Sequence, residues 1–135
     1  MRKDVLKDKS YDFAIRIVRL SQYLQNEHKE YVLSRQILKS GTSIGALVRE
    51  AKYAQSTLDF IHKLSIALKE ANETYYWLSL LHDTNYIETK LFNSLQNDCD
   101  ELISLLVSIV KTSKFNLLQE KNNKGVEHQS AHGSS

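Results

Sequence analysis

The residues best suited to chemistry are basic side chains that recur at helical spacing in the first half of the chain. They are Arg16, Arg19, Arg35, Lys39, Arg49 and Lys52. Lysine and arginine neutralise phosphates and release counterions, so basic side chains gathered on one surface favour nucleic-acid binding. Tyr23 and Tyr53 accompany these charges, and tyrosine rings can stack on bases. The pattern predicts an interface for RNA or DNA on the first two helices.

A second interpretation of the same residues is a solvated surface with internal ion pairs. Lysine and arginine total 18 against 16 aspartates and glutamates, a net charge of only +2, and a nucleic-acid footprint needs clustered charge. Glu50, together with Glu70 or Glu73 on a neighbouring helix, could neutralise Arg49 or Lys52. The sequence therefore leaves two classes open, a nucleic-acid binder and a structural or protein-interaction scaffold without nucleic acid.

Catalytic and metal chemistry find little support. A two-metal site in a helical bundle needs Glu-x-x-His pairs on facing helices, and His62 with the nearby glutamates does not supply them. Gly41 and Gly45 are not followed by the Lys-Ser or Lys-Thr of a phosphate-binding loop. Cys99 falls on an apolar stripe, as a small core residue does. We expect a protein that is not an enzyme and has no metal or cofactor.

The elements that must position the basic residues are long helices, because the chain contains no proline and only 4 glycines. We expect helices at about residues 11–27, 32–55, 58–82 and 88–115, with Ser10 as the N-cap of the first and Ser56 or Thr57 as the N-cap of the third. Apolar residues at spacings of three and four define the buried stripes of the first two helices: Phe13, Ile17, Leu20 and Leu24, then Ile37, Gly41, Ile44, Val48 and Ala51.

Two features of these helices predict how they pack. Gly41 and Gly45 stand four apart on one face, where a second helix backbone can approach closely. The fourth helix carries two apolar stripes, one through Leu95, Cys99 and Leu102 and another through Ile103, Val107 and Val110. A helix that is apolar on two faces is buried on two faces. We therefore expect an oligomer, with an interface formed by Trp77, Ile103, Val107 and Val110.

Length, composition and the C-terminal sequence indicate the domain organisation and the cellular location. Length and composition indicate one domain, a four-helix bundle over residues 1–115. Residues 116–135 have too little apolar surface to repay the entropy of ordering, so we expect a disordered polar tail. The chain shows no apolar run typical of a signal peptide or a membrane span, and a single cysteine, Cys99, cannot form an internal disulfide. We expect a cytoplasmic protein with no membrane contact.

The stretch from Ser34 to Leu81 carries a family resemblance. Its motifs are Arg35-Gln36-Ile37, Gly41-Thr42-Ser43-Ile44-Gly45-Ala46, Arg49-Glu50-Ala51, Asp59 to Ala67, Lys69 to Thr74, and Tyr76-Trp77-Leu78. With them the chain resembles, over about its first 115 residues, the small four-helix-bundle proteins called 23S rRNA-intervening sequence proteins.

That resemblance implies an all-α, up-down-up-down antiparallel four-helix bundle that assembles as a homopentameric ring. A relative with the same architecture, the accessory protein of diversity-generating retroelements, is a pentamer that binds a reverse transcriptase and nucleic acid. The resemblance thus implies self-association and a nucleic-acid-processing partner, by analogy of architecture. One departure is Leu47, where the family usually has Asn; a polar contact made by that Asn in relatives would be missing here.

Overall fold

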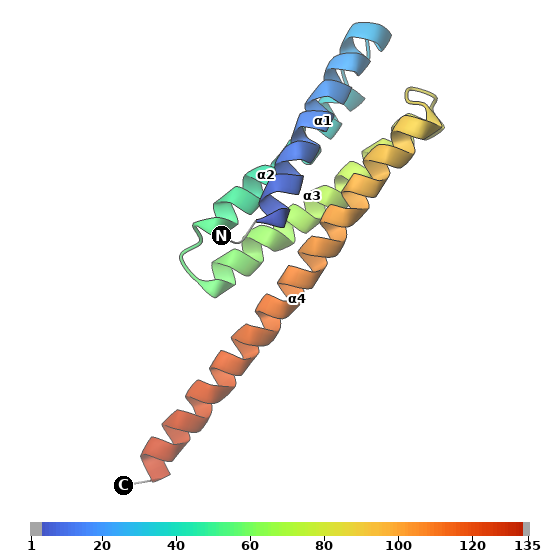
Figure 1. The fold of residues 1–135 in the computed structure, drawn as a ribbon. Helices are drawn as coiled ribbons and strands as arrows, with labels where there is room; N and C mark the ends of the chain where they lie inside the picture. The colour runs from blue at the N-terminus through green and yellow to red at the C-terminus, as the bar shows by residue number, and fades with distance from the viewer. Residues whose placement is uncertain (1–3, 134–135) are drawn as a thin grey trace.

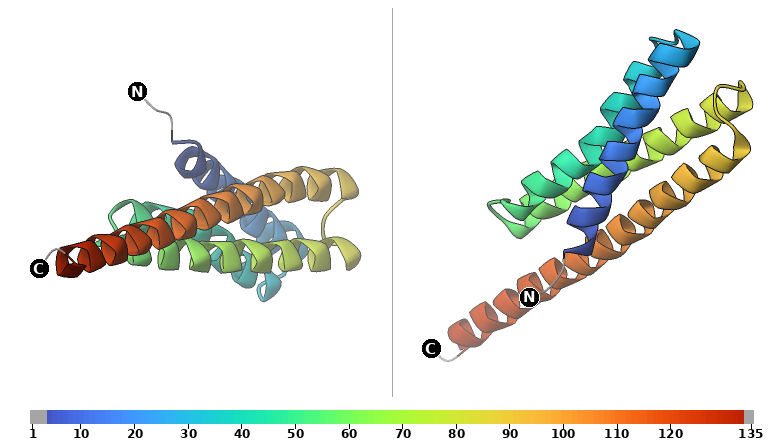
Figure 2. Two further views of the ribbon diagram at one scale, coloured as in Figure 1. Left: turned by 90° about the horizontal axis from the view of Figure 1, so that it is seen from below. Right: turned by 45° about the horizontal axis from the view of Figure 1, so that its top comes forward.

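The chain folds into four α-helices, which we describe from a computed structural model covering residues 4–133, with side chains described through residue 125 (Figure 1). The helices are α1 (Val5–His28), α2 (Leu33–Lys52), α3 (Thr57–Asp83) and α4 (Thr89–Gly133). Short connections reverse the chain between consecutive helices, so each packs antiparallel to the next (Figures 1 and 2). The described residues contain no strand. The predicted all-α bundle of four helices is therefore confirmed.

Helix α1 starts earlier than the sequence predicts. Asp4 is its N-cap, and the Asp4 carboxylate accepts a hydrogen bond from the backbone N–H of Lys7 at 3.0 Å. The predicted cap, Ser10, is instead buried inside the helix and donates its hydroxyl to the Lys7 carbonyl. The prediction was wrong because an aspartate further upstream satisfies the free N–H groups equally well. Nearly two additional turns of α1 therefore precede the predicted start.

Helix α3 begins where the sequence places it. The Ser56 hydroxyl accepts a hydrogen bond from the Asp59 N–H at 3.0 Å, and the Asp59 carboxylate accepts one from the Gln55 N–H at 3.3 Å. The two side chains thus satisfy backbone donors reciprocally, in the manner of a capping box. Helix α2 ends at Lys52, slightly before the predicted residue 55.

Helix α4 ends later than the sequence predicts, at Gly133 instead of near Phe115. The residues after Phe115 include leucine, glutamine, glutamate and lysine, which are good helix formers, and no proline interrupts them. Among the side chains described through residue 125, Val110 is the last buried one and Leu117 the last that packs against the core. The rest of α4 projects past the other helices (Figures 1 and 2). The division into a bundle and a disordered tail stays a prediction.

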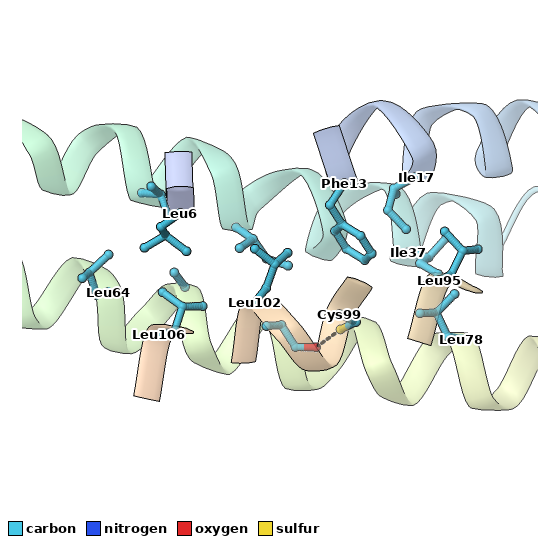
Figure 3. Close-up of a cluster of buried hydrophobic side chains, with 14 of the residues drawn as sticks. Leu6, Phe13, Ile17, Ile37, Leu64, Leu78, Leu95, Cys99, Leu102 and Leu106 are labelled. Carbon is cyan, nitrogen blue, oxygen red and sulfur yellow. Dashed lines mark hydrogen bonds between the residues drawn. The ribbon is translucent and has the colours of Figure 1, made fainter. Parts of the chain in front are cut away.

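The core lies between the four helices and contains the predicted stripes. Phe13, Ile17, Ile37 and Leu102 are among its side chains with at most 1% of their surface exposed, and Figure 3 shows them converging from different helices. The Cys99 thiol donates a hydrogen bond to the Ala71 carbonyl at 3.3 Å. Burial raises the pKa of Cys99 to about 12. Cys99 is therefore a core residue, as the sequence predicts.

The two glycines of α2 bring α1 and α2 together. A Cβ at Gly41 would lie 2.8 Å from Cγ1 and Cγ2 of Ile17, and a Cβ at Gly45 would lie 3.2 Å from the carbonyl oxygen of Ser10. Both positions are in close contact with α1, so a larger residue would push the helices apart. The predicted close approach at Gly41 and Gly45 is confirmed.

The contact between α1 and α4, unlike that between α1 and α2, includes ion pairs between polar side chains. Lys9 Nζ lies 2.6 Å from Glu101 Oε1, and Arg16 Nη1 lies 2.6 Å from Asp98 Oδ2. The hydrogen bond to Glu101 raises the pKa of Lys9. Helix α1 makes fewer contacts with α4 than with α2. Helix α1 is therefore held more closely by α2 than by α4.

Candidate nucleic-acid interface

The six predicted basic residues fall on two separate surfaces. Arg16 and Arg19 line a shallow hollow between α1 and the start of α4, together with Tyr23 and Leu91. Arg16 is held there by its ion pair with Asp98, so part of its charge is already neutralised. This first surface is a poor candidate for binding phosphate.

The other four residues form a row along α2, which we call the α2 row: Arg35, Lys39, Arg49 and Lys52, all exposed. Among the described residues, none of the four takes part in an ion pair. Glu50 instead approaches Lys63, with Oε2 3.4 Å from Nζ. Glu73 accepts a hydrogen bond from the Trp77 indole at 3.3 Å. The neutralising pairs that the alternative interpretation expected from these two glutamates are therefore not formed.

A groove runs beside the C-terminal half of the α2 row. It measures about 540 Å³ and lies between the first half of α1 and the second half of α2. Its lining residues are Lys7, Asp8, Tyr11, Ala14, Thr42, Gly45, Ala46 and Arg49. A smaller hollow adjoins it and shares Lys7 and Arg49, with Lys52 and Tyr53 on its far side. Two exposed tyrosines, Tyr11 at 66% and Tyr53 at 73%, therefore flank a cluster of cations.

Lys7 was not among the predicted site residues because it lies before residue 11, the predicted start of the first helix, and Tyr11 was not singled out although it lies at that start. With α1 starting at Val5, Lys7, Tyr11 and Ala14 follow one another at spacings of four and three and share a face. Tyr23, by contrast, was a predicted stacking residue. Its hydroxyl lies 3.1 Å from His28 Nε2, and the two rings meet edge to face, 5.2 Å apart. Tyr23 is thus partly engaged within the chain, whereas Tyr11 and Tyr53 are more open.

The residues expected at an oligomer interface do not share a free apolar face. Val110 is only 8% exposed and belongs to the core of this chain, which corrects its assignment to a spare face. Ile103 and Trp77 are partly buried against the same core, and Val107 is the one well-exposed member, at 46%. The described chain instead exposes an apolar stripe on α1, formed by Tyr11, Ile15 and Val18. We call these three residues the α1 stripe.

Three other predicted features concern metal binding, Leu47 and membrane contact. No group of three or more histidine, cysteine, aspartate or glutamate side chains could hold a metal ion within the part that the structure describes. Leu47 packs, partly buried, against the core. No helix of the described chain has an apolar stretch long enough to cross a membrane.

Comparison with known proteins decides the family. The model of the 23S rRNA-intervening sequence proteins matches residues 2–108. The chain belongs to this family. The match spans α1 to α3 and α4 as far as residue 108, so the α2 row and the groove lie within the matched region, while the projecting end of α4 lies beyond it.

A solved structure supports the fold at closer range. The chain is 61% identical to a protein of unknown function from the S23 ribosomal protein family of Bacteroides thetaiotaomicron VPI-5482, whose crystal structure superposes with a TM-score of 0.79. The match covers 79% of this chain and 99% of that one. No curated protein matches the sequence. Membership of the 23S rRNA-intervening sequence family therefore establishes an architecture.

Proposed function

We propose that the protein is a non-enzymatic, oligomeric helical bundle that binds RNA through the basic face of α2. The observation that carries this proposal is the α2 row, four exposed cations without carboxylate partners among the described residues. Each phosphate that such a row neutralises releases counterions and adds affinity. Since its members lie on one helix at fixed spacings, the row can follow a phosphate backbone without rearrangement.

The length of the row suits several phosphates. Arg35 and Arg49 are separated by a rise of about 21 Å along a regular α-helix. A homopentamer, which the family resemblance implies, would repeat this row on every subunit and multiply a weak contact. A nucleic-acid-processing protein could share the RNA bound at this surface and so become a partner. A reverse transcriptase is an example, by analogy with the retroelement accessory protein.

Charge reversal tests the proposal. The variant carrying Arg35→Glu, Lys39→Glu and Arg49→Glu is compared with a matched control carrying Lys69→Glu, Lys90→Glu and Lys111→Glu, three cations that are exposed on α3 and α4. Binding of labelled RNA is followed by fluorescence anisotropy over a range of salt concentrations. Loss of three phosphate contacts should make the negative slope of log affinity against log salt shallower by about 2. Equal binding by the two variants refutes the proposal.

A second candidate function is a protein scaffold without nucleic acid, and the α1 stripe favours it. Tyr11, Ile15 and Val18 expose apolar surface at helical spacing, which is typical of a contact with another protein or another copy. Native mass spectrometry of protein purified at low salt without nuclease separates the two candidates. An oligomer with mass that nuclease removes supports RNA binding, whereas a bare oligomer supports the scaffold.

The same measurement locates the interface. If Ile15 and Val18 of the α1 stripe join subunits, Ile15→Glu should yield monomers while Val107→Glu leaves the oligomer intact, since the exposed neighbours of Val107 on α4, Ser104, Ser108 and Lys111, are polar. The reverse result would return the interface to α4, where the sequence predicts it.

A further inference from the structure

The groove between α1 and α2 has a floor without side-chain charge. Gly45 and Ala46 supply one side of it and Ala14 the other. The hydroxyl of Thr42 donates to the Leu38 carbonyl at 2.6 Å, so its proton is committed within the helix. The floor is concave because small residues cover it while both flanking helices carry longer side chains. Such a surface accepts a flat, largely apolar group.

The rim of the groove is aromatic and cationic. Tyr11 stands beside the floor with two-thirds of its surface exposed. Lys7 and Arg49 lie at the end where the smaller hollow adds Lys52. Two carboxylates also lie there, Asp8 and Asp4, and Asp4 is engaged as the N-cap of α1. The three cations Lys7, Arg49 and Lys52 against these two carboxylates leave the rim with a small positive excess.

A nucleotide combines a flat base with an anionic phosphate, and the groove offers an apolar floor for the first and cations for the second. An exposed tyrosine offers its ring to any base, since every base has a π-face, and neighbouring cations track the backbone. The volume of the groove lies within the range of small-molecule sites. Bases in a duplex are stacked inside the helix and cannot enter such a groove, whereas bases of a single strand can be splayed out.

We propose that the groove between α1 and α2 is a subsite for one nucleotide of single-stranded RNA, with the base against Tyr11 and the floor and the phosphate at Lys7 and Arg49. The inference rests on the proposed RNA binding and adds to it the strand class and the position of the base. The α2 row then guides the neighbouring phosphates out of the groove. The floor offers few groups for reading base edges, so the subsite tolerates any base.

Binding of a single-stranded ten-nucleotide oligouridylate and of a hairpin duplex, measured by anisotropy, tests the subsite. Tyr11→Ala removes the stacking ring, and Ala46→Trp fills the floor without altering charge. We expect either change to weaken binding of the single strand, by about 5- to 150-fold for the loss of one stacked base, and to leave duplex binding within about twofold. The matched control is Tyr76→Ala, a similarly exposed tyrosine on α3.

The outcomes separate this inference from the proposed function. If the charge-reversed α2 row loses binding while Tyr11→Ala and Ala46→Trp bind like the wild type, the groove is overturned and RNA binding stands. Equal losses for single strand and duplex also overturn the strand preference. If the wild type binds neither RNA, both proposals fall. A far-UV circular dichroism spectrum equal to that of the wild type is required of each variant before its binding is compared.

Discussion

Replacement of Gly41 by alanine tests the packing on which the groove depends. The new methyl group would lie 2.8 Å from both Cγ1 and Cγ2 of Ile17, a side chain with no exposed surface. Ile17 is branched at Cβ and confined to one rotamer in a helix, so it cannot turn aside. Overpacking of this kind costs about 1–3 kcal/mol, and we place Gly41 at the upper end of that range.

The higher helix propensity of alanine offsets part of this overpacking cost. Alanine is favoured over glycine by about 1 kcal/mol in a helix interior, so the free energy of unfolding should fall by about 2 kcal/mol. Gly125→Ala is the matched control, since a Cβ there meets nothing within 4 Å, and it should not destabilise the protein. Urea unfolding followed by circular dichroism, at one fixed protein concentration, measures both variants.

A double-mutant cycle shows whether Ile17 is the cause. Ile17→Ala opens a cavity and should cost about 2–5 kcal/mol alone. In that background the methyl group of Gly41→Ala finds space, so the second substitution should cost nothing or restore stability, a coupling of about 2 kcal/mol. The reasoning is refuted if Gly41→Ala costs less than about 0.5 kcal/mol in the wild type, or the same in both backgrounds.

Three further predictions concern the thiol, a helix cap and the end of α4. Because the native thiol of Cys99 stays protonated up to a pKa of about 12 while the unfolded thiol ionises near 9.0, the folded state binds more protons and its stability falls as pH rises above 9. Urea titrations at pH 7 and pH 10 should show the wild type losing about 1.4 kcal/mol relative to Cys99→Ala, and an unchanged difference would contradict the burial. Ser56→Ala should lower the free energy of unfolding by about 1 kcal/mol and Ser56→Asp should preserve it; equal losses in thermal melts would argue against the cap. Truncation after Gln119 should leave the urea midpoint almost unchanged, because the described side chains beyond it are exposed; a large drop would show that the bundle extends further.

The apolar pattern predicted the inner faces of the helices well. Phe13, Ile17, Ile37 and Ile44 are all fully buried, because helical periodicity alone decides which residues share a face. The cap at Ser56 was equally readable, since a hydroxyl followed by an acidic residue at the first turn is a local signal. Helix ends were less readable, because several polar residues can cap a helix and the backbone selects one.

The basic residues show the limit of sequence reading. The spacing along α2 placed Arg35, Lys39 and Arg49 on one surface, but nothing in the sequence showed that Arg16 would be paired with Asp98, a residue far along the chain on α4. Pairing across helices depends on which faces meet, and that follows from packing between distant segments. Packing between distant segments also explains why Val110 was assigned to a spare face of the fourth helix, whereas it lies in the core.

The sequence by itself determined the helices, their inner stripes and the family, because these depend on residues close together in the chain. It also marked Gly41 and Gly45 as the point of closest approach, since glycine in a helix interior is costly without a packing reason. Only the tertiary structure decided that Lys7 and Tyr11 of α1 meet Arg49 of α2 across a groove. That juxtaposition requires α1 to begin at its Asp4 cap, nearly two turns before the predicted start, and to lie close against α2. The close approach depends on the packing of whole helices, which no short stretch of sequence determines.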